Sequence, residues 1–344
     1  MKRFIALILA VITLISMTAC SNITNDDKMT NDNNAIQVVD GAGRTVTFDS
    51  PAQTVATSWG GGVDVYLYAL GVSDRIVATN SKHAFDKLYF DPSTMPKVGK
   101  WALDKEALAE VMPDLYLHGA AATEYLEGAN EVGVASYGMG FNTYENVLKN
   151  LEDLGKIFGV EERAEKVIAH CNSIGELIDS RVSQIPENER YSVIVHGEKT
   201  GELSSDIYAT VEVMMARAGG ISCTPEEIRH LTETTVVGLE SIFEWDPDVI
   251  FLQDYECELT VDGIMSDAMW APMTAVQNNR VFAIPCELDT WYKPSPSCYL
   301  GTLYMSMKMY PELYTDINFE EIVIEFYKVV YDLDLTIEDL GIKE

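Results

Sequence analysis

The chain has few basic side chains. Lys and Arg together number 24, against 54 Asp and Glu, which gives a formal net charge of −30 at pH 7. A charge of this sign and size repels phosphate backbones and anionic lipid headgroups. The composition therefore argues against nucleic acid and against an anionic membrane surface as partners of the folded part.

Motifs that mark common catalytic centres are also missing. The sequence contains no G-x-S-x-G, no H-E-x-x-H, no Walker A motif and no carboxylate pair at a catalytic spacing. A hydrolase or a transferase would therefore have no candidate nucleophile, and we predict that the protein is not an enzyme. A surface adhesion or sensor lipoprotein, in which any cleft is incidental, stays open as an alternative.

Cysteine is scarce, and none of the six cysteines belongs to a C-x-x-C pair. One of them, Cys20, lies in the leader described below, and the odd number that remains leaves at least one thiol outside a disulfide. Cys171 falls on the apolar stripe of a predicted helix, which favours a core position. The other four could include a disulfide, a metal ligand or simple thiols: Cys223, Cys257, Cys286 and Cys298.

The first 19 residues have the layout of a secretory signal peptide. Two basic residues precede an apolar run from Phe4 to Ile15, which is too short for a stable transmembrane span. The run is followed by MTAC, which resembles a bacterial lipoprotein box, although Met17 stands where Leu is usual. We therefore predict lipidation of Cys20, with an ordinary secreted protein as the alternative.

Residues 20–34 are rich in Asn and Asp and poor in apolar side chains. Such a segment cannot bury enough surface to fold, and we expect a disordered tether that ends at Asn34. The protein would then be extracytoplasmic and anchored to the cell membrane through its N-terminal lipid only.

A chain of 344 residues exceeds what one hydrophobic core usually serves, so two domains are expected. Its centre, residues 142–186, predicts two consecutive helices. The first carries apolar residues at three- and four-residue spacing from Tyr144 to Phe158, with Asn142 placed as the N-cap. The second, residues 161–184, carries one apolar stripe and would span roughly 35 Å, so we predict that it links two lobes.

Short β-rich runs alternate with helical stretches on both sides of this linker. Residues 35–141 begin with a hairpin around Asp40 and Gly41, and residues 187–344 restart the pattern. The alternation predicts an α/β fold with two Rossmann-like lobes, each built on a mostly parallel sheet. The predicted strands are residues 54–57, 75–79, 114–118 and 134–136 in the first lobe and 191–196, 249–253 and 281–285 in the second.

Parallel sheets bind ligands beyond the carboxyl ends of their strands. In the first lobe this rule selects Ser58, Trp59, Gly60, Asn80, His83, Trp101, His118, Tyr137 and Met139. In the second lobe it selects His196, Glu198, Gln253, Tyr255, Trp291 and Tyr292. The three histidines are weak candidates for a metal ligand, because a histidine at a strand end is as often structural.

One short unit occurs twice. Glu106 stands seven residues before Pro113, and Glu240 stands seven residues before Pro247, with an aspartate after each proline. A helix that is followed by a Pro-Asp turn and a strand is common in α/β proteins. The repeat alone therefore indicates related architecture in the two lobes.

Taken together, these features resemble the solute-binding lipoproteins of ABC importers for iron-siderophores, heme and cobalamin. The resemblance covers the mature chain from Ile36 to the last helix, although Gln53 stands where the family usually has a basic residue. It implies two α/β lobes joined by one rigid long helix, with the ligand held between them. The segments that carry it are VVDGAGRTVTFDSPAQTVAT, YLYALGVSDRIVATN, EALAEVMPDLYLHG, GLESIFEWDPDVIFL and QNNRVFAIP.

The same resemblance implies the partners. Glu106 and Glu240 would dock into the two permease subunits of an importer that is driven by a cytoplasmic ATPase. The cargo would be a chelate of iron or cobalt, such as a ferric siderophore, heme or a corrinoid, carried by a monomer without an intrinsic cofactor. A free metal ion or an oxyanion is the alternative cargo, and the scarcity of cationic residues at the strand ends counts against an oxyanion.

Overall fold

The computed structural model describes residues 35–58, 62–99, 102–196, 209–225, 238–253 and 258–342. The predicted signal peptide, the lipidation site Cys20 and the tether lie outside these residues. Contacts between residues gather Ala35–Glu344 into one unit, separate from Met1–Asn34. None of the helices in the described part of the chain is both long and apolar enough to cross a membrane.

The predicted hairpin is present at the start of the described chain. Strands β1 (Ile36–Val39) and β2 (Thr45–Phe48) pair antiparallel, and the Asp40 carboxylate closes the turn by accepting from the backbone N–H of Arg44 at 2.8 Å. The N–H of Gly41 donates to the carbonyl of Gly138 at 2.7 Å. A Cβ at position 41 would lie 2.6 Å from the backbone nitrogen of Gly140, so only glycine lets the hairpin pack this closely.

The first sheet is parallel throughout, with the strand order β4-β3-β5-β6. Its strands are β3 (Val55–Thr57), β4 (Ile76–Ala78), β5 (Leu115–Gly119) and β6 (Ala135–Met139). All four were predicted, but β6 runs three residues beyond its expected end. The extension contains Gly138, which has low strand propensity and is held by pairing with His118 of β5.

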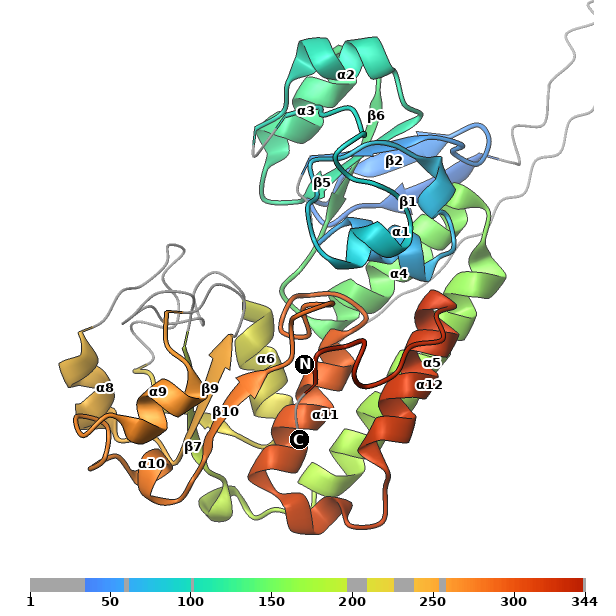
Figure 1. The fold of residues 1–344 in the computed structure, drawn as a ribbon. Coiled ribbons are helices and arrows are strands. Elements are labelled where there is room, and N and C mark those ends of the chain that lie inside the picture. The colour runs from blue at the N-terminus through green and yellow to red at the C-terminus, as the bar shows by residue number, and fades with distance from the viewer. Residues whose placement is uncertain are drawn as a thin grey trace, which may run out of the picture. The chain divides into compact units, whose positions relative to one another are not determined.

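The second sheet is also parallel, with the strand order β10-β9-β7-β8. Its strands are β7 (Ser192–His196), β8 (Ile221–Ser222), β9 (Val249–Gln253) and β10 (Val281–Ile284). The two-residue strand β8 was not predicted, because it is too short to show alternation. With β8, the strand order of the second sheet repeats that of the first. Strands β7, β9 and β10 of the second sheet lie side by side in Figure 1.

Helices cover the sheets. The first lobe has α1 (Asp64–Ala69), α2 (Lys105–Val111), the unpredicted α3 (Thr123–Glu131) and the 3-10 turns η1 (Ser73–Arg75) and η2 (Phe85–Leu88). The second has η3 (Glu187–Glu189), α6 (Ala209–Arg217), α8 (Leu239–Trp245), α9 (Val261–Ser266), α10 (Thr274–Gln277), α11 (Cys298–Met309), η4 (Pro311–Tyr314) and α12 (Phe319–Tyr331).

The repeated Pro-Asp unit has the same hydrogen-bonding role in both lobes. The Asp114 carboxylate accepts from the backbone N–H groups of Gln53 and Thr54, at 2.8 and 2.9 Å. The Asp248 carboxylate accepts from the N–H and the hydroxyl of Ser192, at 2.8 and 2.7 Å. Each aspartate thereby joins the start of one strand to the start of its neighbour, β5 to β3 and β9 to β7. The sequence repeat is therefore a repeat of structure.

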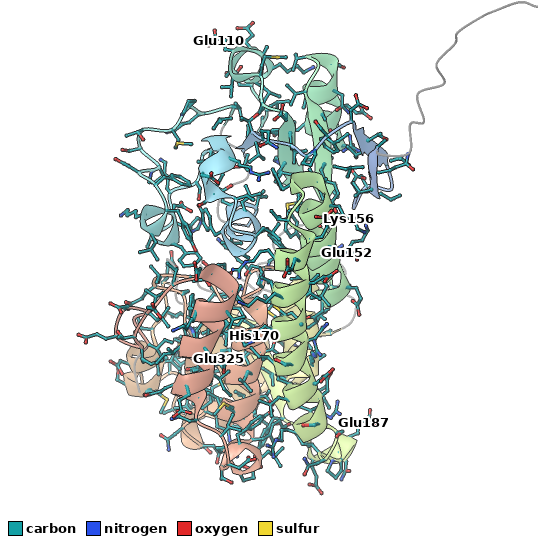
Figure 2. The ribbon with its side chains drawn as sticks, turned by 90° about the vertical axis from the view of Figure 1, so that its right-hand side faces the viewer. Glu110, Glu152, Lys156, His170, Glu187 and Glu325 are labelled. Atoms are coloured by element: carbon teal, nitrogen blue, oxygen red, sulfur yellow. The ribbon has the colours of Figure 1, made fainter. Side chains whose placement is uncertain are left out.

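The two central helices are α4 (Tyr144–Phe158) and α5 (Glu161–Val182). The expected N-cap Asn142 was wrong, because Thr143 has the extended backbone of a cap and its hydroxyl accepts from the N–H of Asn146 at 3.2 Å. Glu152 and Lys156 form an exposed ion pair on α4 (Figure 2).

One hydrophobic core runs through both lobes. It contains side chains of both sheets together with the buried faces of α4, α5, α11 and α12. The residues of α5 in this core are Ala164, Val167, Cys171, Ile174, Ile178 and Val182. Two smaller clusters fill the spaces under α2 and α3 in the first lobe and under α8, α9 and α10 in the second.

Arg163, near the start of α5, ties two other helices together. Its Nε donates to the carbonyl of Ala69 at 2.7 Å, its Nη1 to that of Val329 at 2.8 Å and its Nη2 to that of Val330 at 2.5 Å. These carbonyls lie in the last turns of α1 and α12, where helices leave acceptors unsatisfied. A guanidinium here joins the first lobe to the C-terminal helix.

We expect Arg163→Met to lower the free energy of unfolding by about 3 kcal/mol, because three charge-assisted hydrogen bonds are lost and their acceptors stay partly buried. Urea unfolding followed by circular dichroism measures the loss. Lys166→Met, at an exposed position on the same helix, is the matched control. Equal stability of the two variants would contradict the role given to Arg163.

Candidate functional site

A connected set of buried polar side chains lies at the carboxyl end of the first sheet. The hydroxyl of Thr79 donates to the Asp64 carboxylate at 2.7 Å and accepts from the hydroxyl of Thr57 at 2.9 Å. It also accepts from the N–H of Ser81 at 3.0 Å, and the Ser81 hydroxyl donates to Asp86 at 2.6 Å. The network fixes the segment that follows β4.

Asp86 is the centre of that segment. Besides Ser81, its carboxylate accepts from the hydroxyl of Tyr68 at 2.8 Å and from the backbone N–H of His83 at 2.7 Å. Burial raises the pKa of Asp86, while these donors act in the opposite direction. The carboxylate thereby holds the loop that presents His83.

Asp64 is fully buried, and its Oδ1 has no hydrogen-bond partner among the described residues. Burial raises the pKa of Asp64 to about 7, Asp86 adds to the rise, and the hydroxyls of Thr57 and Thr79 oppose it. Sequence reasoning missed this residue, because an aspartate in the first turn of a helix normally indicates a favourable dipole interaction at the surface.

The loop after β10 is tied to α12 by a second buried network. Asp289 accepts from the hydroxyl of Ser297 and, at 2.9 Å, from the hydroxyl of Tyr327. The indole N–H of Trp291 donates to Tyr327 at 2.8 Å, and the hydroxyls of Ser297 and Tyr331 lie 2.8 Å apart. Burial raises the pKa of Asp289.

The two networks meet where the lobes touch. The ring of Phe85 packs edge-on against Tyr331, with 4.9 Å between ring centroids, and lies 6.1 Å from that of Tyr327. The hydroxyl of Tyr66 in α1 donates to the carbonyl of Pro294 at 2.9 Å. The segments 79–86 of the first lobe and 285–297 of the second both follow the carboxyl ends of strands, and each contacts the opposite lobe, Phe85 against α12 and Pro294 against α1. We call this region the seam.

His83 and Lys293 lie on opposite sides of the seam. Burial lowers the pKa of His83 to about 4, and the neighbouring ammonium of Lys293 contributes to the decrease. The imidazole is therefore neutral at pH 7. The sequence-based selection ended at Tyr292 and missed Lys293, although aromatic residues and prolines on both sides mark this loop.

Several residues selected by the strand-end rule are buried in the first lobe. Ser58 shares a hydrogen bond with the hydroxyl of Tyr116, and the hydroxyl of Tyr137 donates to Asp153 at 2.7 Å. Met139 belongs to the shared core. Their side chains serve the packing of the lobe, whereas Asn80 and His83 are half-buried near the seam.

His118 is 6% exposed, and its ring lies 5.3 Å from that of Tyr125. In the second lobe, Trp291 and Tyr292 are buried in the seam loop, and Gln253 is buried at the end of β9. His196 ends β7, and its side chain lies outside the described part. The selected residues that lie entirely outside it are Trp59, Gly60, Trp101, Glu198 and Tyr255.

No group of three or more His, Cys, Asp or Glu side chains within the described ranges is arranged to hold a metal ion. Neither His83 nor His118 belongs to such a group within these ranges. Cys171 and Cys298 are buried free thiols, so Cys298 forms no disulfide, and Cys257 lies outside the described residues.

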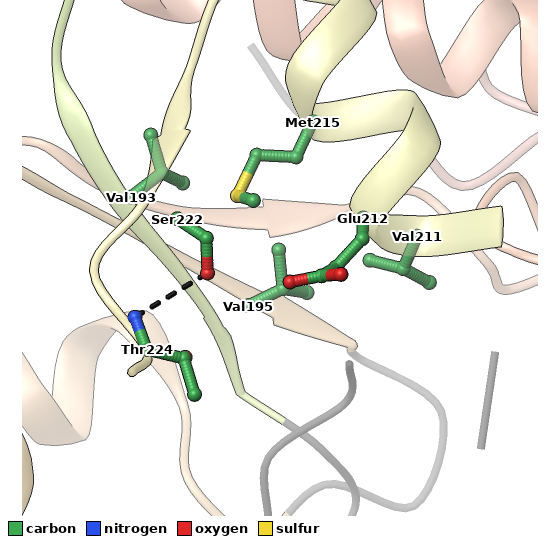
Figure 3. Close-up of a pocket in the computed structure, with 7 residues that line it drawn as sticks. All are labelled: Val193, Val195, Val211, Glu212, Met215, Ser222 and Thr224. Atoms are coloured by element: carbon green, nitrogen blue, oxygen red, sulfur yellow. Dashed lines mark hydrogen bonds between the residues drawn. The ribbon is translucent and has the colours of Figure 1, made fainter. Parts of the chain in front are cut away.

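A small pocket lies near the carboxyl ends of β7 and β8 (Figure 3). The carboxylate of Glu212 on α6 faces it, together with Ser222 and Thr224, whose N–H donates to the Ser222 hydroxyl at 3.3 Å. The strand-end rule missed Glu212, because this residue lies on a helix. The lining residues are Val193, Val195, Val211, Glu212, Met215, Ser222 and Thr224.

Glu106 and Glu240 are both exposed in the first turn of their helices, α2 and α8. Both helices end in a left-handed residue, Met112 with φ 47° and Asp246 with φ 41°. The two glutamates therefore occupy equivalent places in the repeated unit.

We expect Asp64→Asn to flatten the dependence of stability on pH. The folded-state pKa of about 7 exceeds the ordinary value of 3.8, so the stability that Asp64 contributes is present below pH 3.8 and is lost as pH rises to 7. At about 1.4 kcal/mol per pH unit, ionised Asp64 costs about 4 kcal/mol at pH 8, and the isosteric amide removes this cost.

Urea unfolding of both proteins between pH 4 and pH 8 measures the effect. Asp262→Asn, at an exposed site on α9, is the control that should leave the profile unchanged. Parallel profiles for wild type and Asp64→Asn would contradict the assignment.

Comparisons with family models, with sequences and with solved structures all match this chain to binding proteins. Residues 57–288 match the family model described as periplasmic binding protein. The molybdate-binding protein MolA of Haemophilus influenzae is 24% identical over 190 residues, which cover 55% of this chain and 52% of MolA. The chain therefore aligns with only about half the length of that relative.

Two relatives from Bacillus subtilis align over most of the chain. The ABC transporter substrate-binding lipoprotein YvrC is 21% identical over 292 residues, covering 82% of this chain and 87% of YvrC. The petrobactin-binding protein YclQ is 24% identical over 315 residues, covering 85% and 93%. These relatives are named as binding proteins, which confirms the prediction of a non-enzyme.

A periplasmic solute binding protein from Veillonella parvula has the same fold, with a TM-score of 0.74 and 20% identity over 90% of this chain and 96% of that one. The predicted α/β architecture, with two sheet-containing lobes and a long helix, is therefore confirmed. Because the family model also matches most of the sequence, the chain belongs to the periplasmic binding protein family.

Proposed function

We propose that this protein captures a metal chelate between its two lobes, outside the cytoplasmic membrane, and delivers it to the permease of an ABC importer. The observation that carries the proposal is the seam, where the loops that follow the carboxyl ends of both parallel sheets each contact the opposite lobe. Ligands of α/β sheets bind at such edges. Two lobes that contribute to one site can enclose a bulky ligand.

The residues at the seam favour a chelate over a bare metal ion. The described part of the chain has no group of three metal-ligating side chains, so an uncomplexed ion would find no ready coordination sphere there. The relative YclQ, named for petrobactin, supports an iron chelate.

An oxyanion is the second candidate ligand. The relative MolA is named for molybdate, and Lys293 supplies a positive charge that the sequence-based selection had overlooked. Heme and corrinoids remain within the chelate class, and the ligand would contain iron or cobalt.

We also propose that Glu106 and Glu240 dock onto the two permease subunits. They are exposed at equivalent places in the two lobes, and a pair of carboxylates at a fixed separation can recognise a two-fold partner through charge-assisted hydrogen bonds. Lipidation at Cys20 would hold the protein at the membrane as a monomer. The relative YvrC, named as a lipoprotein, supports this anchor.

Titration of the purified protein with hemin, cyanocobalamin, ferric citrate and molybdate tests the ligand class. We expect at least one metal chelate to quench tryptophan fluorescence, because Trp291 is buried in the seam loop. N-acetyltryptophanamide in the same titration corrects for absorption by the ligand. A response to molybdate alone would favour the oxyanion, and no response to any probe would contradict the proposal.

Replacement of both Glu106 and Glu240 tests whether the protein delivers its ligand to the permease. We expect Glu106→Gln with Glu240→Gln to reduce ligand-dependent ATPase activity of the reconstituted importer roughly tenfold or more, with ligand affinity unchanged. Glu110→Gln with Glu244→Gln is the matched control, because these exposed glutamates lie one turn further along the same two helices. Equal activity of the two double variants would contradict the docking role.

A further inference from the structure

We infer that a groove on the second lobe is a second binding site, and that it takes a small amphiphilic carboxylate such as a free fatty acid. The groove has a volume of about 490 Å³ and lies between β10, α11, α12 and the chain that follows α12. None of the described residues that line it belongs to the two segments of the seam. The inference is therefore independent of the proposed function.

The lining of the groove is mostly apolar. Sites for small molecules have such linings and volumes of roughly 300–1,000 Å³, with a few polar groups that orient the ligand. The apolar side chains are half-buried, so the protein leaves part of their surface uncovered, and a ligand with an apolar body would remove that surface from water. These side chains are Phe282, Tyr304, Met307, Phe319, Ile337 and Ile342.

The aromatic wall of the groove is held from behind. The rings of Tyr304 and Phe319 lie 6.1 Å apart, centroid to centroid. Both pack against the ring of Trp291, at centroid distances of 6.4 and 6.1 Å. The indole of Trp291 in turn donates to the hydroxyl of Tyr327. This wall is therefore preformed, as the walls of small-molecule sites usually are.

The chain that follows α12 forms another wall. Leu340 is 3% exposed and belongs to the main core. Thr336 donates from its N–H and its hydroxyl to the carboxylate of Asp339, at 2.8 and 2.7 Å. The N–H of Ile342 donates to the carbonyl of Ile337 at 3.3 Å. These contacts hold the two isoleucines at the groove.

Lys308 supplies a positive charge inside the groove. Its ammonium lies over the rings of Phe282 and Tyr304, 5.7 and 5.3 Å from their centroids. It forms no hydrogen bond and no ion pair with any residue in the described ranges. The two ring faces attract the ammonium, and its three N–H donors stay available to an anionic head group.

Glu320 also lines the groove, but it is placed differently. It is exposed in the first turn of α12, where the helix dipole favours a carboxylate. Lys308 is half-buried beside the apolar walls. A ligand whose body lies against these walls would therefore meet the ammonium with its head group. Charge complementarity then favours a carboxylate over a neutral or cationic head group.

Isothermal titration calorimetry with decanoate, decanol and decyltrimethylammonium tests the inference, because the three probes share one alkyl chain. We expect decanoate to bind with a Kd about tenfold or more below that of the other two, since a charge-assisted contact adds to the same apolar burial. Lys308→Met should raise the Kd of decanoate about tenfold and leave that of decanol unchanged. Lys328→Met is the matched control, because Lys328 pairs with Asp334 at 3.2 Å on α12, outside the groove.

Ile342→Asp is a second variant, with a melting temperature measured beside each titration. It places a carboxylate in the groove, and we expect a loss of decanoate affinity of about tenfold or more. Equal binding of decanoate and decanol, or an equal response of Lys308→Met and Lys328→Met, would overturn the inference. So would a preference for decyltrimethylammonium, binding of no probe, or displacement of decanoate by a chelate that binds at the seam. The titrations use no metal chelate, so failure of the inference leaves the proposed function standing.

Discussion

The structure depends on the apolar stripe of α5. Its residues, among them Val167, Ile174 and Ile178, belong to one core that includes side chains from both sheets. Independent lobes would each have a separate core and could rotate about a flexible linker. Here a change in the relative position of the lobes would disturb packed side chains, and interiors resist such changes because they are close-packed. Arg163 reinforces the same arrangement by joining α1 to α12. The relative position of the two lobes at the seam is therefore set by core packing.

Repetition of one architecture explains how the two proposed docking residues are distributed. Both sheets have the same strand order, and in both an aspartate after a proline fixes the starts of two adjacent strands. Equivalent helices consequently carry Glu106 and Glu240 at equivalent places. The loops that follow the strands differ between the lobes. At the seam the first lobe has His83 and Asp86, whereas the second has Asp289 and Lys293. A shared scaffold with different loops agrees with relatives that are named for ligands as different as molybdate and petrobactin.

Local patterns in the sequence predicted most of the fold. Both predicted central helices, seven of the eight strands in the parallel sheets and the hairpin are present, because periodicity and turn residues act over a few positions. Such patterns could not predict the two-residue strand β8 or the N-cap at Thr143. The site was less predictable. The strand-end rule identified His83 and Trp291 at the seam, but it also selected Tyr137, whose hydroxyl is bound to Asp153 in the core. Asp64 and Lys293 were missed because their surroundings are assembled from distant segments, as the contact between Tyr66 and Pro294 illustrates.

We propose that a ligand binds at the seam and contacts both lobes at once. Hydrogen exchange of backbone amides, measured with and without a bound chelate, tests it most directly, because exchange reports protection segment by segment. We expect slower exchange in residues 79–86 of the first lobe and in residues 285–297 of the second, in the same experiment. Protection in one lobe only, or in segments remote from the seam, would contradict it.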